Sequence, residues 1–275
     1  MTTSVEPTRN PVALVTGGSS GIGECTVTEL LDAGYTVYTV ARRVERMKAL
    51  ADAGAHVFAM DVTDDASVVA GVQRIIEEQG RIDLLVNNAG YGSYGAVEDV
   101  PIAEARRQFE VNVFGLARLT QLVLPHMRAQ RSGRIINISS IGGKFYEPYG
   151  AWYHATKFAV EGFSDSLRIE LKPFGIKVVI IEPGPIITEW NEIARDSLLE
   201  MSGSGDYAAY AKKAHAVLVQ ADKPGRASKP QTVAKKIRKA ATKKRPAARY
   251  PVGRGAGTIT TSRDDILSAR HVVTS

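Results

Sequence analysis

Short apolar runs alternate with helix-period segments along most of this chain, and this alternation constrains the fold more than any other feature. Each run is rich in valine, isoleucine and leucine, as expected of a strand that is buried on both faces. The segments between the runs place apolar residues three or four positions apart, which is the spacing of an amphipathic helix. The runs are 12–15, 36–40, 55–60, 82–86, 133–138 and 176–181.

Alternating strands and helices of this kind predict a parallel sheet with helices on both faces. We therefore expect an α/β fold, a Rossmann-like doubly wound parallel sheet of about seven strands, with 249–252 as its last edge strand. The length suits a single domain over 1–275. Within it, 185–248 has an interrupted helical pattern and a basic composition, which predict a lid and a C-terminal extension. The Gly/Thr/Ser-rich segment 253–275 is expected to be loosely held.

Positive charge is concentrated at the C-terminal end. Residues 201–275 hold 16 Lys and Arg against 4 Asp and Glu, a net charge of +12, although the whole chain carries +6. Such asymmetry can indicate an acidic carrier protein or a nucleic-acid partner. Because no recognised nucleic-acid motif accompanies the charge, we expect a solvated basic helix and no nucleic-acid binding.

Other features of the sequence bear on its compartment. The first eleven residues are polar and lack the apolar run of a signal peptide, and no stretch reaches the ~18 apolar residues that a membrane span needs. The lone Cys25 excludes an internal disulfide. We expect a soluble protein of the cytoplasm, without stable membrane insertion.

A glycine-rich turn joins the first apolar run to the first helical segment. A turn of this kind lets the backbone approach a pyrophosphate, while the following helix N-terminus supplies free N–H groups and a positive dipole. Alone the spacing could be an ordinary strand-to-helix turn, but with a strand before it and a helix after it, it predicts nucleotide binding. The turn reads Thr16-Gly17-Gly18-Ser19-Ser20-Gly21-Ile22-Gly23.

Two arginines follow the second apolar run. In a dinucleotide site an acid at this point binds the ribose 2′-hydroxyl, whereas basic side chains accommodate a 2′-phosphate. Here Ala41 removes the acid, and Arg42 and Arg43 offer guanidinium groups that suit phosphate oxygens. This pattern favours NADP(H) over NAD(H), although two surface arginines that open a helix would look the same.

Tyr153 and Lys157 lie four residues apart in a long amphipathic segment that ends at Leu171. On a helix this spacing places both side chains on one face. A phenol titrates near pH ~10, so an adjacent ammonium is expected to lower the pKa of Tyr153 and make it a general acid or base for a carbonyl or alcohol group. A lone pair of this kind is more often a solvated helix face.

These motifs occur together, in order, and the sequence resembles the short-chain dehydrogenase/reductase family over roughly residues 10–190. Each match is weak by itself, but their order and spacing are specific. The matches are Thr16-Gly17-x-x-x-Gly21-x-Gly23, Asp61-Val62, Asn87-Asn88-Ala89-Gly90, Asn112, Ser140, Tyr153-x-x-x-Lys157 and Pro183-Gly184-x-x-x-Thr188.

The resemblance implies a catalytic set of four residues. Tyr153 would be the general acid in reduction and the base in oxidation, and Lys157 would lower its pKa and bind the nicotinamide ribose. Ser140, chosen over Ser139 because the family serine usually lies thirteen residues before the tyrosine, would hydrogen-bond the substrate oxygen. Asn112 would hold a water that relays protons to Lys157.

The resemblance also implies which residues bind the cofactor. Asp61 would contact the adenine amino group, and Thr188 the carboxamide. The expected cofactor residues are Gly17, Ser19, Ser20, Gly21, Ile22, Gly23, Arg42, Arg43, Asp61, Val62, Asn88, Ala89, Gly90, Tyr153, Lys157, Pro183, Gly184, Ile186 and Thr188.

The function implied is an NADP(H)-dependent oxidoreductase that acts on a carbonyl or secondary alcohol. The basic C-terminal part resembles that of members acting on steroids, retinoids or polyketides, so the substrate could be bulky and lipophilic. The alternatives are a non-catalytic NADP(H)-binding regulatory module and an NAD-dependent alcohol dehydrogenase of the same family. By resemblance, a homodimer or homotetramer is expected.

No metal site is expected, because the five histidines are scattered; His154, beside Tyr153, is interpreted as a helix-surface residue. Several aromatic residues could wall an apolar substrate pocket, although loop packing explains them almost as well. They are Tyr91, Tyr94, Phe145, Tyr146, Tyr149 and Trp190.

Overall fold

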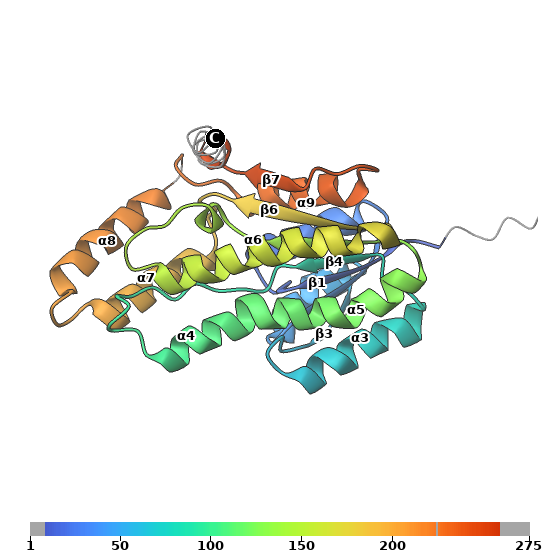
Figure 1. The fold of residues 1–275 in the computed structure, drawn as a ribbon, viewed down its shortest axis with the longest axis horizontal. Helices are drawn as coiled ribbons and strands as arrows, with labels where there is room; N and C mark the ends of the chain where they lie inside the picture. The colour runs from blue at the N-terminus through green and yellow to red at the C-terminus, as the bar shows by residue number, and fades with distance from the viewer. Residues whose placement is uncertain (1–8, 224, 259–275) are drawn as a thin grey trace, which may run out of the picture.

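The computed structural model describes residues 9–223 and 225–258, and it contains one seven-stranded sheet (Figure 1). The strand order is β3-β2-β1-β4-β5-β6-β7 and every neighbouring pair is parallel, which confirms the predicted doubly wound architecture. The strands are β1 (Val12–Thr16), β2 (Thr36–Ala41), β3 (His56–Ala59), β4 (Leu84–Asn87), β5 (Gly133–Ile138), β6 (Ile176–Pro183) and β7 (Arg249–Val252).

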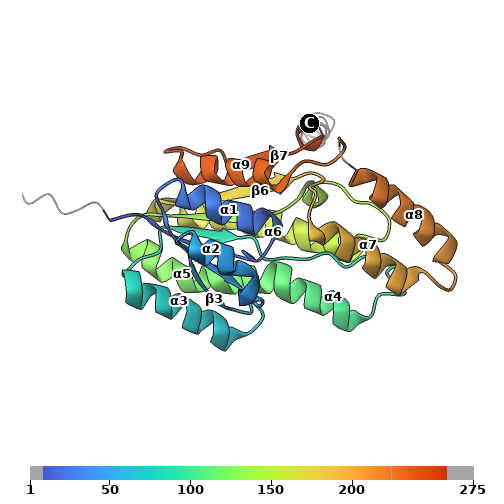
Figure 2. The same ribbon diagram turned by 180° about the vertical axis from the view of Figure 1, so that it is seen from behind.

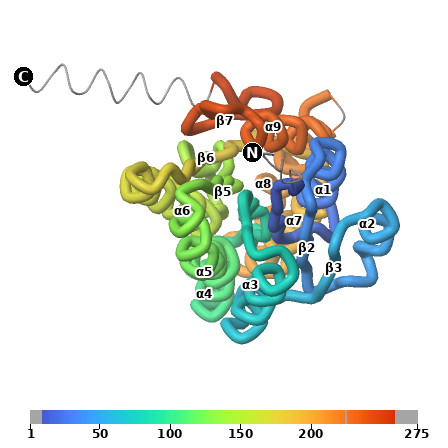
Figure 3. The backbone as a smooth tube through the Cα atoms, turned by 90° about the vertical axis from the view of Figure 1, so that its right-hand side faces the viewer, coloured from blue at the N-terminus to red at the C-terminus, as the bar shows by residue number. Residues whose placement is uncertain are grey.

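Helices cover both faces of this sheet, as the view along the strands shows (Figure 3). Helices α1, α2 and α9 lie on one face, and α3, α5 and α6 lie on the other. The helices are α1 (Gly21–Leu31), α2 (Lys48–Asp52), α3 (Asp65–Gln79), α4 (Ile102–Phe109), α5 (Leu116–Ala129), α6 (Ala151–Leu171), α7 (Glu189–Ser202), α8 (Ala208–Ala221) and α9 (Pro230–Thr242). Short 3₁₀ turns are η1 (Val44–Met47), η3 (Ile141–Gly143) and η4 (Lys172–Phe174).

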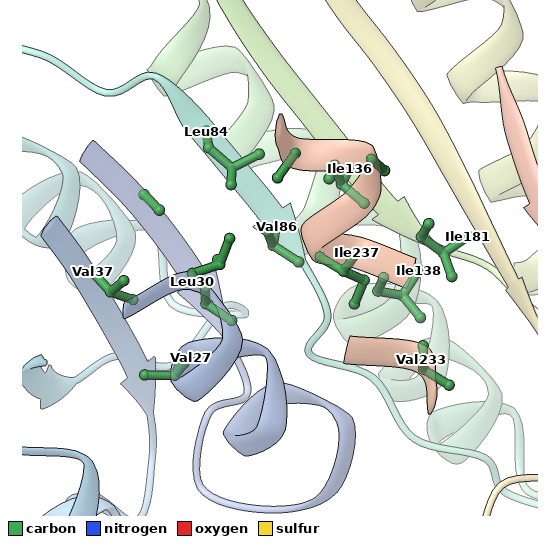
Figure 4. Close-up of a cluster of buried hydrophobic side chains, with 14 of the residues drawn as sticks. Val27, Leu30, Val37, Leu84, Val86, Ile136, Ile138, Ile181, Val233 and Ile237 are labelled. Carbon is green, nitrogen blue, oxygen red and sulfur yellow. The ribbon is translucent and has the colours of Figure 1, made fainter. Parts of the chain in front are cut away.

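The basic helix α9 is part of the hydrophobic core. Its apolar face places Val233 and Ile237 against the sheet, and both side chains are fully buried in the same cluster as Val86 of β4 and Leu30 of α1 (Figure 4). Lys235 and Lys239 lie on the exposed side of the same helix. The positive charge of this region therefore faces solvent while its aliphatic residues extend the core, as expected of an amphipathic helix.

Helices α4 and α5 join through a π-helical segment, η2 (Glu110–Gly115), to form one long rod. A π segment adds a residue to a turn and rotates the side chains that follow it. Asn112 lies in this segment and is buried. The local change in helix geometry thus determines where the Asn112 amide points.

Helices α7 and α8 extend from one end of the molecule, beyond the carboxyl ends of the strands (Figures 1 and 2). The predicted interruption at residues 202–205 separates them. Residues 259–275 of the predicted tail lie outside the described residues. Within 9–223 and 225–258, no helix combines the length and apolar composition that crossing a membrane requires.

We predict that Ile237→Ala destabilises the whole domain, because it leaves a cavity in the core between α9 and the sheet. Large-to-small changes at fully buried aliphatic sites cost about 2–5 kcal/mol. The free energy of unfolding in urea measures this cost. The matched control is Ile169→Ala, whose side chain is 75% exposed and whose loss should change stability by less than about 0.5 kcal/mol. Equal, small losses for both variants would show that α9 is not part of the cooperative unit.

Candidate functional site

A cavity of about 710 Å³ opens at the carboxyl edge of the sheet. The carboxyl ends of parallel strands meet at one edge, so loops that are far apart in the sequence converge there. Every predicted site residue lines this cavity except Gly23 and Asn112, which lie behind its wall. The predicted residues that line it are Gly17, Ser19, Ser20, Gly21, Ile22, Arg42, Arg43, Asp61, Val62, Asn88, Ala89, Gly90, Ser140, Tyr153, Lys157, Pro183, Gly184, Ile186 and Thr188.

The glycine-rich turn forms a close-fitting cradle between β1 and α1. Gly17 has φ of +71°, which favours glycine, and its N–H donates to Val40 O at 2.8 Å. A Cβ on Gly23 would lie 2.1 Å from Gly17 O, so this glycine acts by close packing and not by contact with a ligand. Ser20 precedes α1 without a side-chain capping bond, which leaves the first N–H groups of the helix available. This cradle fits a dinucleotide pyrophosphate.

Basic side chains follow β2, as predicted. Arg42 and Arg43 line the cavity and no acid lies at the end of the strand. Arg43 and Arg46 both form ion pairs with Glu189, the first residue of α7; the Arg43 Nη2 to Glu189 Oε2 distance is 3.8 Å. The Asp61 carboxylate accepts hydrogen bonds from the N–H and the hydroxyl of Thr63.

Tyr153, Lys157 and Ser140 also line the cavity. The side chains of Tyr153 and Lys157 come from the first turns of α6 and are buried, with 7% and 9% exposure. Lys157 Nζ donates to Ile138 O at 2.9 Å and lies 5.8 Å from the centre of the Tyr153 ring. Ser140 Oγ accepts from Gly142 N at 3.0 Å, which holds the hydroxyl at the end of β5.

Burial moves the pKa values of the phenol and the amine in opposite directions. It raises the pKa of Tyr153 to about 12; the charge of Glu147 adds to this rise, and a hydrogen bond from Ser140 opposes it. Burial lowers the pKa of Lys157 to about 8, against the raising effect of Glu161. Both shifts follow from the cost of a charge in a poorly solvated site. The pKa of Tyr153 is thus raised overall in the chain by itself, and the lowering by the Lys157 ammonium stays a prediction.

Asn112 connects the loop after β4 to α6. Its Oδ1 accepts from Tyr91 N at 3.0 Å, and its Nδ2 donates to Tyr91 O at 2.8 Å and Thr156 Oγ1 at 3.1 Å. Its amide is thus satisfied internally, as a buried amide must be. Because Thr156 precedes Lys157, Asn112 helps to set the position of α6 relative to the cavity.

His154 and Glu147 line the cavity beside the predicted site residues but were not themselves predicted as such. His154 was expected on the helix surface, which is wrong: its side chain is buried, with Nδ1 2.8 Å from Gly142 O and Nε2 3.2 Å from the N–H of Glu147. Glu147 also lines the cavity. Of the aromatic residues, four line the cavity as predicted, whereas Tyr146 is 82% exposed and Tyr149 lies outside the lining.

An ionic cluster around two buried glutamates lies next to the segment that follows Ser140. Lys144 Nζ lies 3.3 Å from a carboxylate oxygen of Glu161 and 3.6 Å from one of Glu182. Arg249 Nε lies 3.1 Å and 3.4 Å from the carboxylate oxygens of the same two residues. Burial and the neighbouring Glu161 raise the pKa of Glu182 to about 7. The cluster links the segment after η3 to α6, β6 and β7. Its four members come from distant parts of the chain, so no local sequence pattern predicts it.

Comparisons with known proteins agree with this geometry. The short chain dehydrogenase family matches residues 11–198. A 3-ketodihydrosphingosine reductase of Bacteroides thetaiotaomicron is 38% identical over 247 residues, which is 88% of this chain and 87% of that protein. An NADPH-dependent 3-dehydrocapnine reductase of Ornithobacterium rhinotracheale is 40% identical over 186 residues, 64% of this chain and 66% of that protein. The crystal structure of a short-chain dehydrogenase from Streptomyces avermitilis, 36% identical, superposes with a TM-score of 0.82 over 96% of this chain and 95% of that chain.

We predict that Lys157→Met changes the pH dependence of stability. Because folding lowers the pKa of Lys157 from 10.5 to about 8, the unfolded chain binds more protons between these values, and wild-type stability gains a contribution that grows as pH rises through this window. The variant lacks this contribution. The difference in melting temperature, variant minus wild type, should therefore decrease as the pH rises from 7.5 to 10.

The control for this measurement is Lys212→Met, which removes an exposed lysine of α8. Its difference in melting temperature from the wild type should stay constant over the same range. A constant difference for Lys157→Met as well would contradict the buried state of this amine.

Proposed function

Since this chain belongs to the short-chain dehydrogenase/reductase family, we propose that it is an NADP(H)-dependent oxidoreductase that reduces the carbonyl group of a lipophilic ketone. One observation carries the proposal: a buried tyrosine and a buried lysine lie with a serine in the wall of the cavity that also holds the glycine-rich cradle. Two relatives, named as reductases of 3-ketodihydrosphingosine and 3-dehydrocapnine, support the reaction type.

Three residues of this chain have separate roles in the proposed reaction. When bound, the nicotinamide supplies the hydride. Ser140 holds the substrate oxygen through its hydroxyl, and Tyr153 donates a proton to that oxygen as negative charge develops on it. Lys157, whose Nζ lies 5.8 Å from the Tyr153 ring centre, stabilises the phenolate that remains.

The protonation state of Tyr153 suits the role of proton donor in reduction. With a pKa of about 12 the phenol is fully protonated at neutral pH, which is the form that a general acid needs.

NADP(H) is proposed over NAD(H) because of Arg42 and Arg43. Guanidinium groups at this point suit a 2′-phosphate, and the residue that ends β2 is Ala41, not an acid that would bind a 2′-hydroxyl. One relative is named as an NADPH-dependent reductase, which agrees with this choice of cofactor. Helices α7 and α8 would act as the lid, since Trp190, Ile193 and Leu218 line the cavity.

We also propose a homo-oligomer in the cytoplasm. Ile102 and Phe114, each 55% exposed, flank a shallow hollow with Phe109 and Trp152 along the rod of α4 and η2. An exposed apolar hollow on this scale suits a subunit contact.

We predict that Tyr153→Phe loses ketone reduction while it keeps the cofactor site. The loss of a positioned proton donor should lower kcat by about 10²–10⁴-fold. The dissociation constant of NADPH, measured by fluorescence, should stay within about threefold of the wild type, since the phenol is not part of the cradle. The control is Tyr210→Phe, an exposed phenol of α8. Full activity of Tyr153→Phe would refute the mechanism, and NADPH binding without any turnover by the wild type would favour a regulatory module.

We predict that Arg42→Ala combined with Arg43→Ala removes the preference for NADPH. Loss of charge-assisted hydrogen bonds to a phosphate should lower kcat/KM with NADPH by roughly 10- to 100-fold and leave kcat/KM with NADH nearly unchanged. Arg226→Ala, which removes an exposed arginine outside the cavity, is the control. Equal losses with both cofactors would contradict recognition of the 2′-phosphate by these residues.

A further inference from the structure

The substrate part of the cavity contains a carboxylate without a matching cation. Two other carboxylates that line the cavity do have cation partners. Asp222 forms an ion pair with Arg195, and Glu189 forms ion pairs with Arg43 and Arg46. Among the described residues, no lysine or arginine forms an ion pair with Glu147. Its side chain is 35% exposed and lines the cavity beside Tyr153.

His154 does not supply the missing charge, although its Nε2 lies 4.0 Å from Glu147 Oε1. Nε2 accepts a hydrogen bond from the backbone N–H of Glu147, so this nitrogen carries no proton. The proton is then on Nδ1, which donates to Gly142 O at 2.8 Å. A histidine with one donating and one accepting nitrogen is neutral, so His154 brings no positive charge to Glu147.

Aromatic rings lie next to this carboxylate. The hydroxyl of Tyr94 donates to Glu147 Oε1 at 2.9 Å. The Tyr94 ring lies 6.2 Å from the Trp190 ring, nearly perpendicular to it, and the Tyr153 ring lies 4.9 Å from Trp190. A carboxylate beside aromatic rings is the combination that binds an ammonium group, through charge and through the electron-rich ring faces.

The charge of Glu147 also affects the proposed proton donor. Burial is the largest cause of the raised pKa values of Tyr94 and Tyr153, and the charge of Glu147 raises both further. It therefore opposes the phenolate that forms when Tyr153 gives its proton to a substrate. A positive charge on the substrate would cancel this opposition at the moment of proton transfer.

We propose that Glu147, Tyr94 and Trp190 form a subsite for a protonated amine close to the reacting carbonyl, so that the substrate is an amino ketone with an apolar chain. This inference rests on the proposed function and names its substrate class. The apolar chain would lie against Phe145, Ile193 and Leu218, which line the same cavity. The amine of the substrate would pair with Glu147, with which no lysine or arginine of the described residues forms an ion pair.

The test compares 2-aminododecan-3-one, whose amine can be protonated, with its N-acetyl derivative, whose amide nitrogen is neutral. With the wild type and NADPH, kcat/KM should be roughly 10- to 100-fold higher for the free amine, as expected for a charge-assisted hydrogen bond. Glu147→Gln keeps an oxygen that can accept from Tyr94 but removes the charge. It should bring the two kcat/KM values within about threefold of each other, mainly by a loss with the amine.

Glu192→Gln is the matched control, because it removes an exposed carboxylate of α7 outside the cavity and should leave the ratio unchanged. A wild-type ratio near one, or a high ratio that persists in Glu147→Gln, would overturn the amine subsite. If neither ketone is reduced, the proposed function fails. Calorimetry then tests the subsite alone: in the presence of NADP⁺, 2-aminododecan-3-ol should bind at least tenfold more weakly to Glu147→Gln than to the wild type, and equal affinities would overturn it.

Discussion

The burial of one phenol and one amine on the same face of α6 is the constraint on which the rest of the site depends. Tyr153 and Lys157 are each largely removed from water, and the pKa values of the two groups move in opposite directions as a result, to about 12 and about 8. A protonated phenol and an amine that titrates near neutrality are suited to giving and recovering a proton. Neither property would survive on a solvated helix face.

The surrounding structure keeps these two side chains in place. Asn112, in the π-helical segment, binds the loop after β4 and the residue before Lys157. Next to the segment that follows Ser140, the cluster of Lys144, Glu161, Glu182 and Arg249 joins four separate elements. These contacts limit the movement of α6 and of Ser140, so the reactive groups are positioned before any ligand arrives.

Most of the fold and of the cofactor cradle could be predicted from the sequence, because their signals are local. The glycine-rich turn and Arg42 lie directly after strands, and the order of strands along the chain places both at one edge of the sheet. The features that were missed depend on tertiary contacts. His154 looked like a surface residue because its partner, Gly142, lies in a loop whose path the sequence does not reveal. Likewise, the raised pKa of Tyr153 comes from burial and from Glu147, which the spacing of Tyr153 and Lys157 does not reveal.

Transfer of deuterium from the cofactor to a ketone tests the central claim most directly. The purified protein would be incubated with NADPH deuterated at C4 of the nicotinamide, using each of the two C4 epimers in turn, and with 2-aminododecan-3-one. Mass spectrometry of the product would locate the label. The account predicts an amino alcohol with one deuterium on the carbon that bears the hydroxyl, formed from one epimer only. Unlabelled alcohol from both epimers, or tight NADPH binding with no alcohol formed, would contradict it.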